Sequence, residues 1–459
     1  MLSYNYTKPQ KRVIDVKLSY SWDRFPERTL NTFVTGDETF DMKTFTQSDE
    51  KGTTLKTYYN ECFSDRNSLE INAALSYMDS KYDRGFSSPK VDSRYKVDGQ
   101  KYSIRAHVNY THNFNDISSI VLGYQQMGAY TNNVYTDNKQ MVAGMNTNAQ
   151  YLFAEYTTSV GPLAIIAGVG GSRHSFSQAT NKYSFFSFRP TVTLQYDIDR
   201  QWQIVYKLWR DASVPDLAEL TAYDKQEDTY QVVTGNPGLK PFNTDTHALI
   251  ASWQNQNFSA RLYGLYQYTH HGIANAPIVE HEKLFWYTMD NNLNHHHFET
   301  ALYASGSFLR RMINIYVEPK YEYDLSKGIF NNHNGRYSVQ TGLNAYYGKW
   351  SANIYFRTAT EILSGNILTH NYATSDLNIG YRHNALMVRA GLRNAFNKDG
   401  KSSTVYQLSD IVKSTLTQGN RGFGNMVYLS LSWNFLKGKQ GEAQQVPNIE
   451  ADNDAGIVK

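Results

Sequence analysis

The sequence lacks the features that several common classes of protein require. It contains one cysteine, Cys62, among 459 residues, so no intrachain disulfide or cysteine-based metal site can form. No run of about eighteen apolar residues is present, which excludes a conventional transmembrane helix. The formal net charge of +3 is too small for a chain of this length to indicate nucleic acid as a partner. Met1 to Thr7 lack the charged and apolar regions of a signal peptide, so an export signal, if the protein has one, is expected upstream.

Aromatic residues, by contrast, are abundant. Tyrosine occurs 36 times, and aromatics make up 14% of the chain. Tyrosine and tryptophan join an apolar body to a polar tip and therefore suit the interface between a membrane and water. The mean hydropathy is negative, which argues against a helical membrane protein. It is compatible with a membrane β-barrel, whose inner face and loops are polar.

Alternation with a period of two is the main structural signal, and it is clearest near the end of the chain. Between Val427 and Phe435 every second residue is apolar, and the residues between them are polar. The same pattern recurs along the sequence. It predicts strands near residues 11–22, 28–46, 54–62, 69–77, 102–110, 117–130, 144–158, 162–176, 183–197, 201–212, 249–253, 258–266, 284–307, 312–324, 336–347, 351–363, 371–382, 385–396 and 427–435.

The predicted connections alternate between short and long. Residues 197–200 and 254–257 are short turns, whereas polar loops are expected at 80–99, 132–143, 210–243, 325–335 and 397–424. Outer-membrane barrels have short periplasmic turns and longer outer loops. This assignment directs the last strand towards the periplasm.

The sequence therefore predicts an all-β fold, an antiparallel up-and-down transmembrane β-barrel with about 18–20 strands. The barrel is expected to occupy residues 1–436, and residues 437–459 form a polar, disordered periplasmic tail. A soluble propeller or sandwich is the alternative. It is disfavoured because no repeat of 40–50 residues is visible and because charges cluster on one face of the strands.

Two regions resemble the TonB-dependent receptors. The first contains Phe188-Arg189-Pro190, the strand at 202–210, Asp216-Leu217-Ala218-Glu219-Leu220 and Gly235-Asn236-Pro237-Gly238-Leu239-Lys240-Pro241. It is similar to the family's Asn-Pro-x-Leu-Lys-Pro-Glu element, with Phe242 in place of the final glutamate. The second is the ending Trp433-Asn434-Phe435, which resembles the closing strand that the outer-membrane assembly machinery reads. The tyrosine-rich strands look most like the Bacteroidota branch.

The resemblance implies a 22-stranded barrel, plugged by an N-terminal domain, that imports a nutrient with energy supplied through TonB. Nothing before residue 11 could form that plug, so we interpret the chain as the C-terminal barrel portion of a receptor, in a truncated or split form. The expected partners are outer-membrane lipid, the barrel assembly machinery, an unknown extracellular ligand, and TonB only through a plug outside this chain. No enzymatic activity and no cofactor are expected. A plug-free passive pore or structural barrel and a surface adhesin or binding scaffold are the alternatives.

Three groups of residues are candidates for functional roles. Pro237 and Pro241 fix backbone angles, and with Asn236, Leu239 and Lys240 they are expected to shape the mouth of the barrel rather than to contact ligand. In the predicted register the lumen receives the charged side chains of Arg261, Glu318, Lys320, Arg389 and Arg393. The apolar face of the last strand, the predicted assembly signal, is formed by Leu429, Leu431, Trp433 and Phe435.

A histidine triplet, His295-His296-His297, raises the question of a metal site. Adjacent residues of a strand point to opposite faces, so only His295 and His297 could share one. A polar strand segment near the outer rim is the preferred interpretation, and no metal is predicted. The acidic stretch between Asp216 and Asp228 is likewise interpreted as a solvated outer loop.

Overall fold

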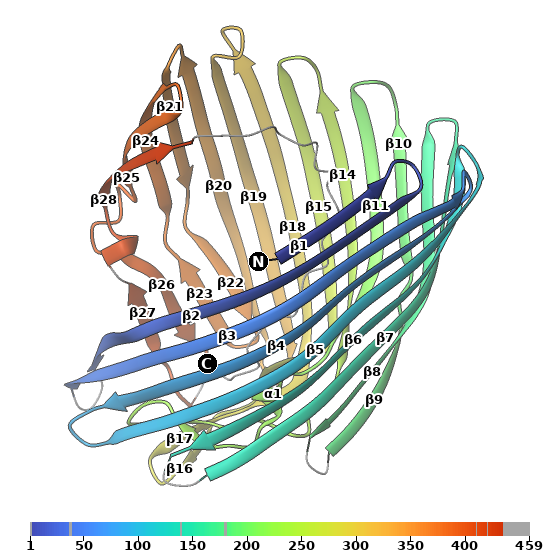
Figure 1. Ribbon diagram of the computed structural model, residues 1–459. Helices are drawn as coiled ribbons and strands as arrows, with labels where there is room; N and C mark the ends of the chain where they lie inside the picture. Colours follow the sequence, from blue (N-terminus) through green and yellow to red (C-terminus); the bar gives the residue numbers. More distant parts are fainter. Residues whose placement is uncertain are drawn as a thin grey trace.

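Nearly all of the described chain is β-strand. The computed structural model describes residues 2–35, 39–137, 140–178, 181–409, 411–419 and 421–434 (Figure 1). Within these ranges no helix has the length and apolar character needed to cross a membrane. The described residues contain one α-helix, α1 (Leu217–Leu220), which has four residues, and one 3₁₀ turn, η1 (Arg421–Phe423).

The main element is a curved antiparallel sheet of 20 strands, in which consecutive strands pair with each other except at one interrupted strand. This result confirms the predicted up-and-down arrangement. The strands are β1 (Leu2–Lys8), β2 (Arg12–Thr35), β3 (Thr39–Ser64), β4 (Asn67–Ser87), β5 (Asp92–Asn115), β6 (Ser118–Thr136), β7 (Gln140–Val160), β8 (Leu163–Gln178), β9 (Asn181–Phe188), β10 (Thr191–Asp197), β11 (Trp202–Ser213), β14 (Phe242–Gln254), β15 (Phe258–Asn275), β18 (Met289–Phe308), β19 (Ile313–Gly328), β20 (Asn332–Tyr347), β21 (Trp350–Arg357), β24 (Thr374–His383), β25 (Leu386–Arg393) and β28 (Met426–Trp433).

Two of these strands, β9 and β10, are halves of one strand. Both pair with β8, and the interruption falls at Arg189-Pro190. Pro190 has no backbone N–H and cannot donate to the ladder. The backbone N–H of Arg189 still donates to the Gly170 carbonyl at 2.8 Å, so the register continues across the interruption.

The two faces of the sheet differ as the alternation requires. On β19 the exposed side chains of Ile315 and Val317 lie on the outer face, whereas Glu318 and Lys320 are partly covered on the inner face. Aromatic pairs gather beside the short turns: Trp202 contacts Trp253 with ring centroids 6.2 Å apart, and Trp350 contacts Tyr381 at 4.8 Å. Such a band is typical of a strand end at a membrane interface.

The connections at one end of the sheet are all short, with two to four residues, and every long connection lies at the other end. The longest connections are residues 214–241, 276–288, 358–373 and 394–425. Four predictions about individual segments are wrong here. The expected loops at 80–99 and 132–143 are mostly strand, because β4, β5, β6 and β7 continue as polar hairpins; Arg94, for example, donates to Asp83 across the β4–β5 pair at 2.8 Å. The predicted strand at 28–46 instead spans the end of β2 and the start of β3, and the loop expected at 325–335 is reduced to 329–331.

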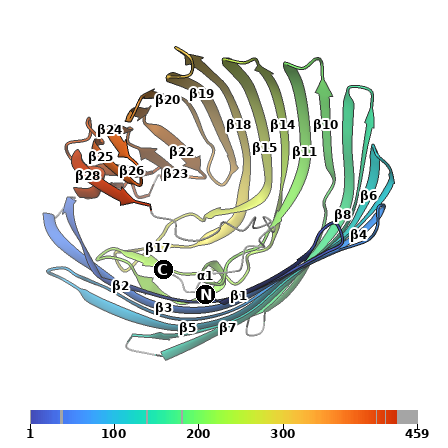
Figure 2. The same ribbon diagram turned by 45° about the horizontal axis from the view of Figure 1, so that its top comes forward.

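Two small sheets are built from the long connections. One contains β12 (Lys225–Gln226), β13 (Gln231–Val233), β16 (Val279–His281) and β17 (Leu284–Tyr287). The other contains β22 (Thr360–Ser364), β23 (Ile367–Asn371), β26 (Lys401–Gln407) and β27 (Thr415–Gly419). The loop expected at 397–424 therefore carries ordered strands. In Figure 2 α1 and β17 lie inside the curve of the sheet.

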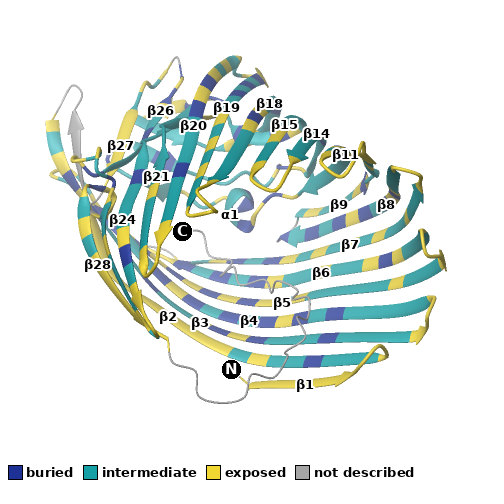
Figure 3. Ribbon diagram, turned by 90° about the horizontal axis from the view of Figure 1, so that it is seen from above, coloured by how far each residue is buried: buried dark blue, intermediate teal, exposed yellow. Residues whose placement is uncertain are grey.

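The two outermost strands of the sheet are β1 and β28. In the described residues β1 pairs only with β2, and β28 only with β25, so the sheet is open between them (Figure 3). Leu429, Leu431 and Trp433 are exposed on one face of β28. Phe435 and the predicted tail at 437–459 lie outside the described residues.

Candidate functional site

Residues 214–241, here called the inserted segment, lie within the space that the sheet encloses (Figure 2). The expectation of a solvated outer loop is therefore wrong for this stretch. Its apolar side chains explain the difference. Leu217, Leu220 and Leu239 are buried against Met145 and Phe176 of the wall. Burying a leucine from water contributes about 1.5–3 kcal/mol, which favours the inward position.

A second apolar cluster joins the inserted segment to the neighbouring strands. Ala218 and Tyr223 pack against a buried group formed by Tyr82, Tyr95, Val97, Tyr135 and Ala143. The rings of Tyr223 and Tyr135 stack with their centroids 4.9 Å apart. The segment is thus packed against β4 to β7 over a continuous stretch of the wall.

Polar contacts hold the same segment at its edges. Glu227 forms an ion pair with Arg84 of β4. The Tyr223 hydroxyl donates to Asp137 at 2.7 Å, and Gln178 donates to the Thr221 hydroxyl at 3.0 Å. These contacts connect the segment to strands on both sides of the apolar clusters.

The Asn236-to-Pro241 motif is placed at the end of the inserted segment. Asn236 accepts a hydrogen bond from the Gly238 N–H at 2.8 Å and donates to the Met289 carbonyl at 2.9 Å. The Lys240 N–H donates to Asn291 at 2.6 Å, and Asn291 donates back to the Lys240 carbonyl at 2.8 Å. Leu239 is 0% exposed. These contacts hold the motif beside β18, and its mouth-shaping role stays a prediction.

The acidic residues of the segment contact the protein itself. Glu219 accepts the Asp216 N–H at 2.9 Å at the start of α1, and Asp228 accepts the N–H groups of Tyr230 and Gln231 at 2.7 and 2.8 Å. Burial raises the pKa of Glu219 and of Asp228, because it disfavours the charged form. Burial likewise lowers the pKa of Lys225. The stretch is therefore built into the fold.

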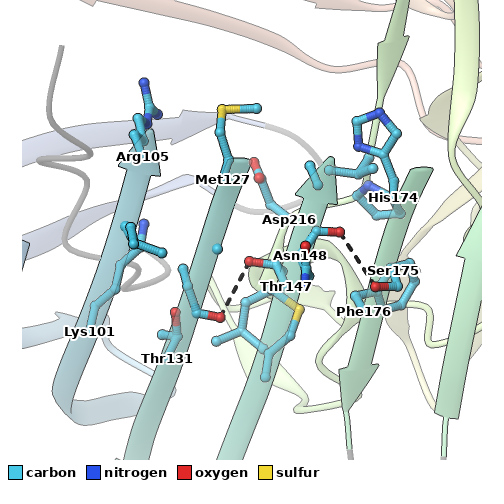
Figure 4. A pocket seen from close by; sticks show the side chains of 18 of the residues that line it. Lys101, Arg105, Met127, Thr131, Thr147, Asn148, His174, Ser175, Phe176 and Asp216 are labelled. Carbon is cyan, nitrogen blue, oxygen red and sulfur yellow. Dashed lines mark hydrogen bonds between the residues drawn. The ribbon is translucent and has the colours of Figure 1, made fainter. Parts of the chain in front are cut away.

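A pocket of about 460 Å³ lies between the wall and the start of the inserted segment (Figure 4). This volume is within the range of ligand-binding pockets, roughly 300–1,000 Å³. Strands β5 to β8 supply one side and residues 212–218 the other. The lining mixes apolar and polar side chains and includes Lys101, Arg105, Met127, Thr131, Thr147, His174, Phe176, Asp216 and Leu217.

The charges around this pocket are mainly basic. Lys101 and Arg105 lie on the same face of β5, and Asp216 is the acidic residue of the lining (Figure 4). No acidic side chain of the described residues lies within ion-pair distance of Arg105. The pocket can therefore hold a polar ligand with anionic or hydrogen-bond-accepting groups.

The predicted luminal charges lie away from this pocket. Arg261 stacks over the Tyr303 ring at 5.7 Å, Lys320 pairs with Glu322 at 3.1 Å, and Arg393 pairs with Asp376 at 3.7 Å. Glu318 and Arg389 are half-buried on β19 and β25. Five charges on three strands are thus distributed along the wall and do not form one site.

The histidine triplet divides between the faces as its spacing predicts. His295 and His297 lie beside Asp324 of β19, whereas His296 stacks on Tyr268 with ring centroids 4.5 Å apart. Sequence reasoning missed Asp324 and Asn291, whose roles depend on strand register. It also missed Arg105. The position of this residue on the polar face of the predicted strand at 102–110 could have indicated it.

Comparison with known proteins identifies the class of this barrel. The family model described as "TonB dependent receptor-like, beta-barrel" matches residues 4–279. The chain therefore belongs to the TonB-dependent receptor β-barrel family. Members are outer-membrane transporters rather than enzymes, and they interact with TonB and with extracellular ligands. The end of the sheet with the long connections is accordingly the outer mouth.

Solved structures show the same fold at low sequence identity. The copper transporter OprC has a TM-score of 0.67 and 13% identity, covering 94% of this chain and 71% of that one. The ferric yersiniabactin uptake receptor FyuA from Yersinia pestis has a TM-score of 0.62 and 12% identity, covering 93% and 69%. The siderophore receptor PiuA from Acinetobacter baumannii has a TM-score of 0.60 and 8% identity, covering 94% and 76%. A comparison with curated protein sequences gave no match.

Proposed function

We propose that this barrel takes up a small, polar nutrient from outside the cell by TonB-dependent import. The observation that carries the proposal is the pocket of about 460 Å³ under the inserted segment, with Lys101 and Arg105 on its wall. A ligand entering from the outer mouth meets this pocket inside the sheet. The inserted segment then covers the ligand on the side opposite the wall.

The packing of the inserted segment supports uptake rather than surface adhesion. An adhesin needs its binding loops exposed, whereas Leu217, Leu220 and Leu239 are buried against the wall. A passive pore, the other alternative, needs a clear path along the lumen. The inserted segment occupies part of the space inside the curve of the sheet.

The test compares energised uptake with passive permeation. The chain is expressed together with any plug-coding sequence upstream of it, in two bacterial strains that differ only in an intact or deleted tonB gene, and accumulation of a panel of labelled anionic and neutral solutes is measured. The proposal expects at least one solute to accumulate only in the strain with TonB. Arg105→Ala should reduce that accumulation, and Arg94→Ala, on the exposed β4–β5 hairpin, should not.

Reconstituting the purified chain in liposomes tests the alternative of a passive pore directly. If small sugars equilibrate across these vesicles without TonB, and tonB deletion changes no uptake in cells, the barrel is a passive pore. Surface binding that persists after both transport assays fail would favour the adhesin.

A further inference from the structure

A group of titratable side chains unrelated to the pocket lies on the inner face of β18, β19 and β20. The register pairs His297 with Asp324 and Glu299 with Glu322 across β18 and β19. Arg336 pairs with Glu322 across β19 and β20. Alternate residues of a strand share a face, so these side chains form one cluster in the outer half of the strands.

Two imidazole nitrogens converge on a single carboxylate oxygen in this cluster. Nε2 of His295 is 3.1 Å from Oδ1 of Asp324, and Nδ1 of His297 is 2.7 Å from the same oxygen. The ligand atoms of these three residues all lie within 4.8 Å of one another. Zinc–nitrogen and zinc–oxygen bonds are about 2.0–2.2 Å, so small side-chain movements would suffice for all three groups to bind one ion.

The remaining polar atoms are held by other partners, which fixes the orientation of the three groups. Nδ1 of His295 contacts the Ser326 hydroxyl at 3.1 Å, leaving Nε2 directed at Asp324. Arg336 donates to the other oxygen of Asp324, Oδ2, and also binds Glu322. The guanidinium therefore does not occupy the position between the imidazoles and Oδ1. Outer partners of this kind orient metal ligands and raise affinity.

The charge balance also favours a cation. Three carboxylates, of Glu299, Glu322 and Asp324, face the two permanent cations Lys320 and Arg336. With neutral imidazoles the cluster keeps one unmatched negative charge, which either a proton on His297 or a bound cation would balance. The Asp324 side chain is only 3% exposed, so water compensates little of that charge.

We propose that His295, His297 and Asp324 form a binding site for a divalent transition-metal ion on the inner wall of the barrel. Two imidazole ligands favour zinc, nickel or cobalt over calcium or magnesium, which prefer oxygen. Glu299, 3.7 Å from Nε2 of His297, and Glu322 form a second ligand set with the same histidine. A bound ion would link β18 to β19. The site stands independently of the proposed nutrient uptake.

The experiment uses the purified full chain in detergent, stripped of metal and titrated calorimetrically with zinc, and with cobalt as a spectroscopic probe. The wild type is expected to bind one equivalent, and bound cobalt should show the intense visible absorption of a low-coordinate site. A His295→Gln/His297→Gln variant should lose this equivalent or bind at least about tenfold more weakly. A matched His271→Gln/His281→Gln variant removes two exposed histidines and should bind as the wild type does.

Folding of each variant is checked by its heat-dependent gel mobility. A wild type with no equivalent of bound zinc would overturn the proposal, as would a His295→Gln/His297→Gln variant that binds as tightly as the wild type. If this variant fails to fold, Asp324→Asn, which keeps the side-chain volume, replaces it under the same two criteria. Loss of metal binding without change in nutrient uptake separates this site from the proposed function.

Discussion

Arg84 of strand β4 and Glu227 of the inserted segment form an ion pair between residues 143 positions apart in the sequence. Both side chains are mostly covered, at 25% and 20% exposure. The pair therefore attaches the segment to the wall more firmly than a surface pair would.

Replacing Glu227 with glutamine should loosen the inserted segment without unfolding the barrel. The change leaves the Arg84 guanidinium partly buried without its counter-charge, at a cost of about 1–3 kcal/mol. Hydrogen exchange of peptides from 217–233 should accelerate by about tenfold or more. Asp83→Asn, which breaks the more exposed pair with Arg94, is the control and should leave that exchange unchanged. If exchange accelerates equally in both variants, the ion pair between Arg84 and Glu227 does not attach the segment to the wall.

Leu239→Ala should weaken the same docking through lost packing. The side chain is fully buried with Leu217, Leu220 and Phe176, and such truncations cost about 2–5 kcal/mol. We expect local exchange in 214–241 to rise while the heat-dependent gel mobility of the barrel stays as in the wild type. Val279→Ala, at a side chain 61% exposed, should change neither measurement. Unchanged exchange in residues 214–241 of the Leu239→Ala variant would show that Leu239 does not hold the segment against the wall.

Gly235→Ala should displace the turn that precedes the Asn-Pro motif. A Cβ at this position would lie 2.4 Å from the Thr221 carbonyl oxygen, closer than atoms can approach. Relieving that contact requires breaking the hydrogen bond from the Gly235 N–H to the same oxygen, at 3.1 Å. We expect a loss of about 1–3 kcal/mol in docking and faster tryptic cleavage after Lys225. In Gly144→Ala, where the nearest atom is 3.8 Å away, cleavage should match the wild type.

The sequence predicted the sheet well because one local rule determines it: apolar and polar residues alternate along each strand. Alternation placed Leu429 and Trp433 on one face, and it separated His296 from His295 and His297. The rule failed where both faces of a strand are polar. Residues 80–99 looked like a loop but form a hairpin stabilised by the backbone ladder and by pairs such as Asp83 with Arg94.

The inward position of the inserted segment could not be predicted in the same way. Its stability comes from contacts between Leu239 and Phe176, and between Tyr223 and Tyr135, which no local pattern connects. The acidic side chains were misleading for a related reason. Asp228 and Glu219 accept backbone N–H groups of their own segment, so their charge did not indicate exposure to solvent.

Acidification should strengthen the docking of the inserted segment through Asp228. Burial raises the pKa of this carboxyl above its ordinary value, although hydrogen bonds from the N–H groups of Tyr230 and Gln231 oppose the shift. A folded state with the higher pKa binds the proton more tightly. The contribution of the Asp228 carboxyl to the stability of the docked segment is therefore complete below its unfolded pKa. It is lost as the pH rises through the pKa of the folded state.

Asp228→Asn isolates this effect from the other titrating groups, which include Lys225 and Tyr287 nearby. The asparagine side-chain oxygen still accepts both N–H groups but carries no charge at any pH. We therefore expect the variant's segment to exchange more slowly than the wild type's at pH 7.5, after correction for intrinsic rates, and the two to converge towards pH 4. Exchange that is faster in the variant at pH 7.5 would mean that the hydrogen bonds to the carboxylate outweigh its burial, and that the pKa of Asp228 is not raised.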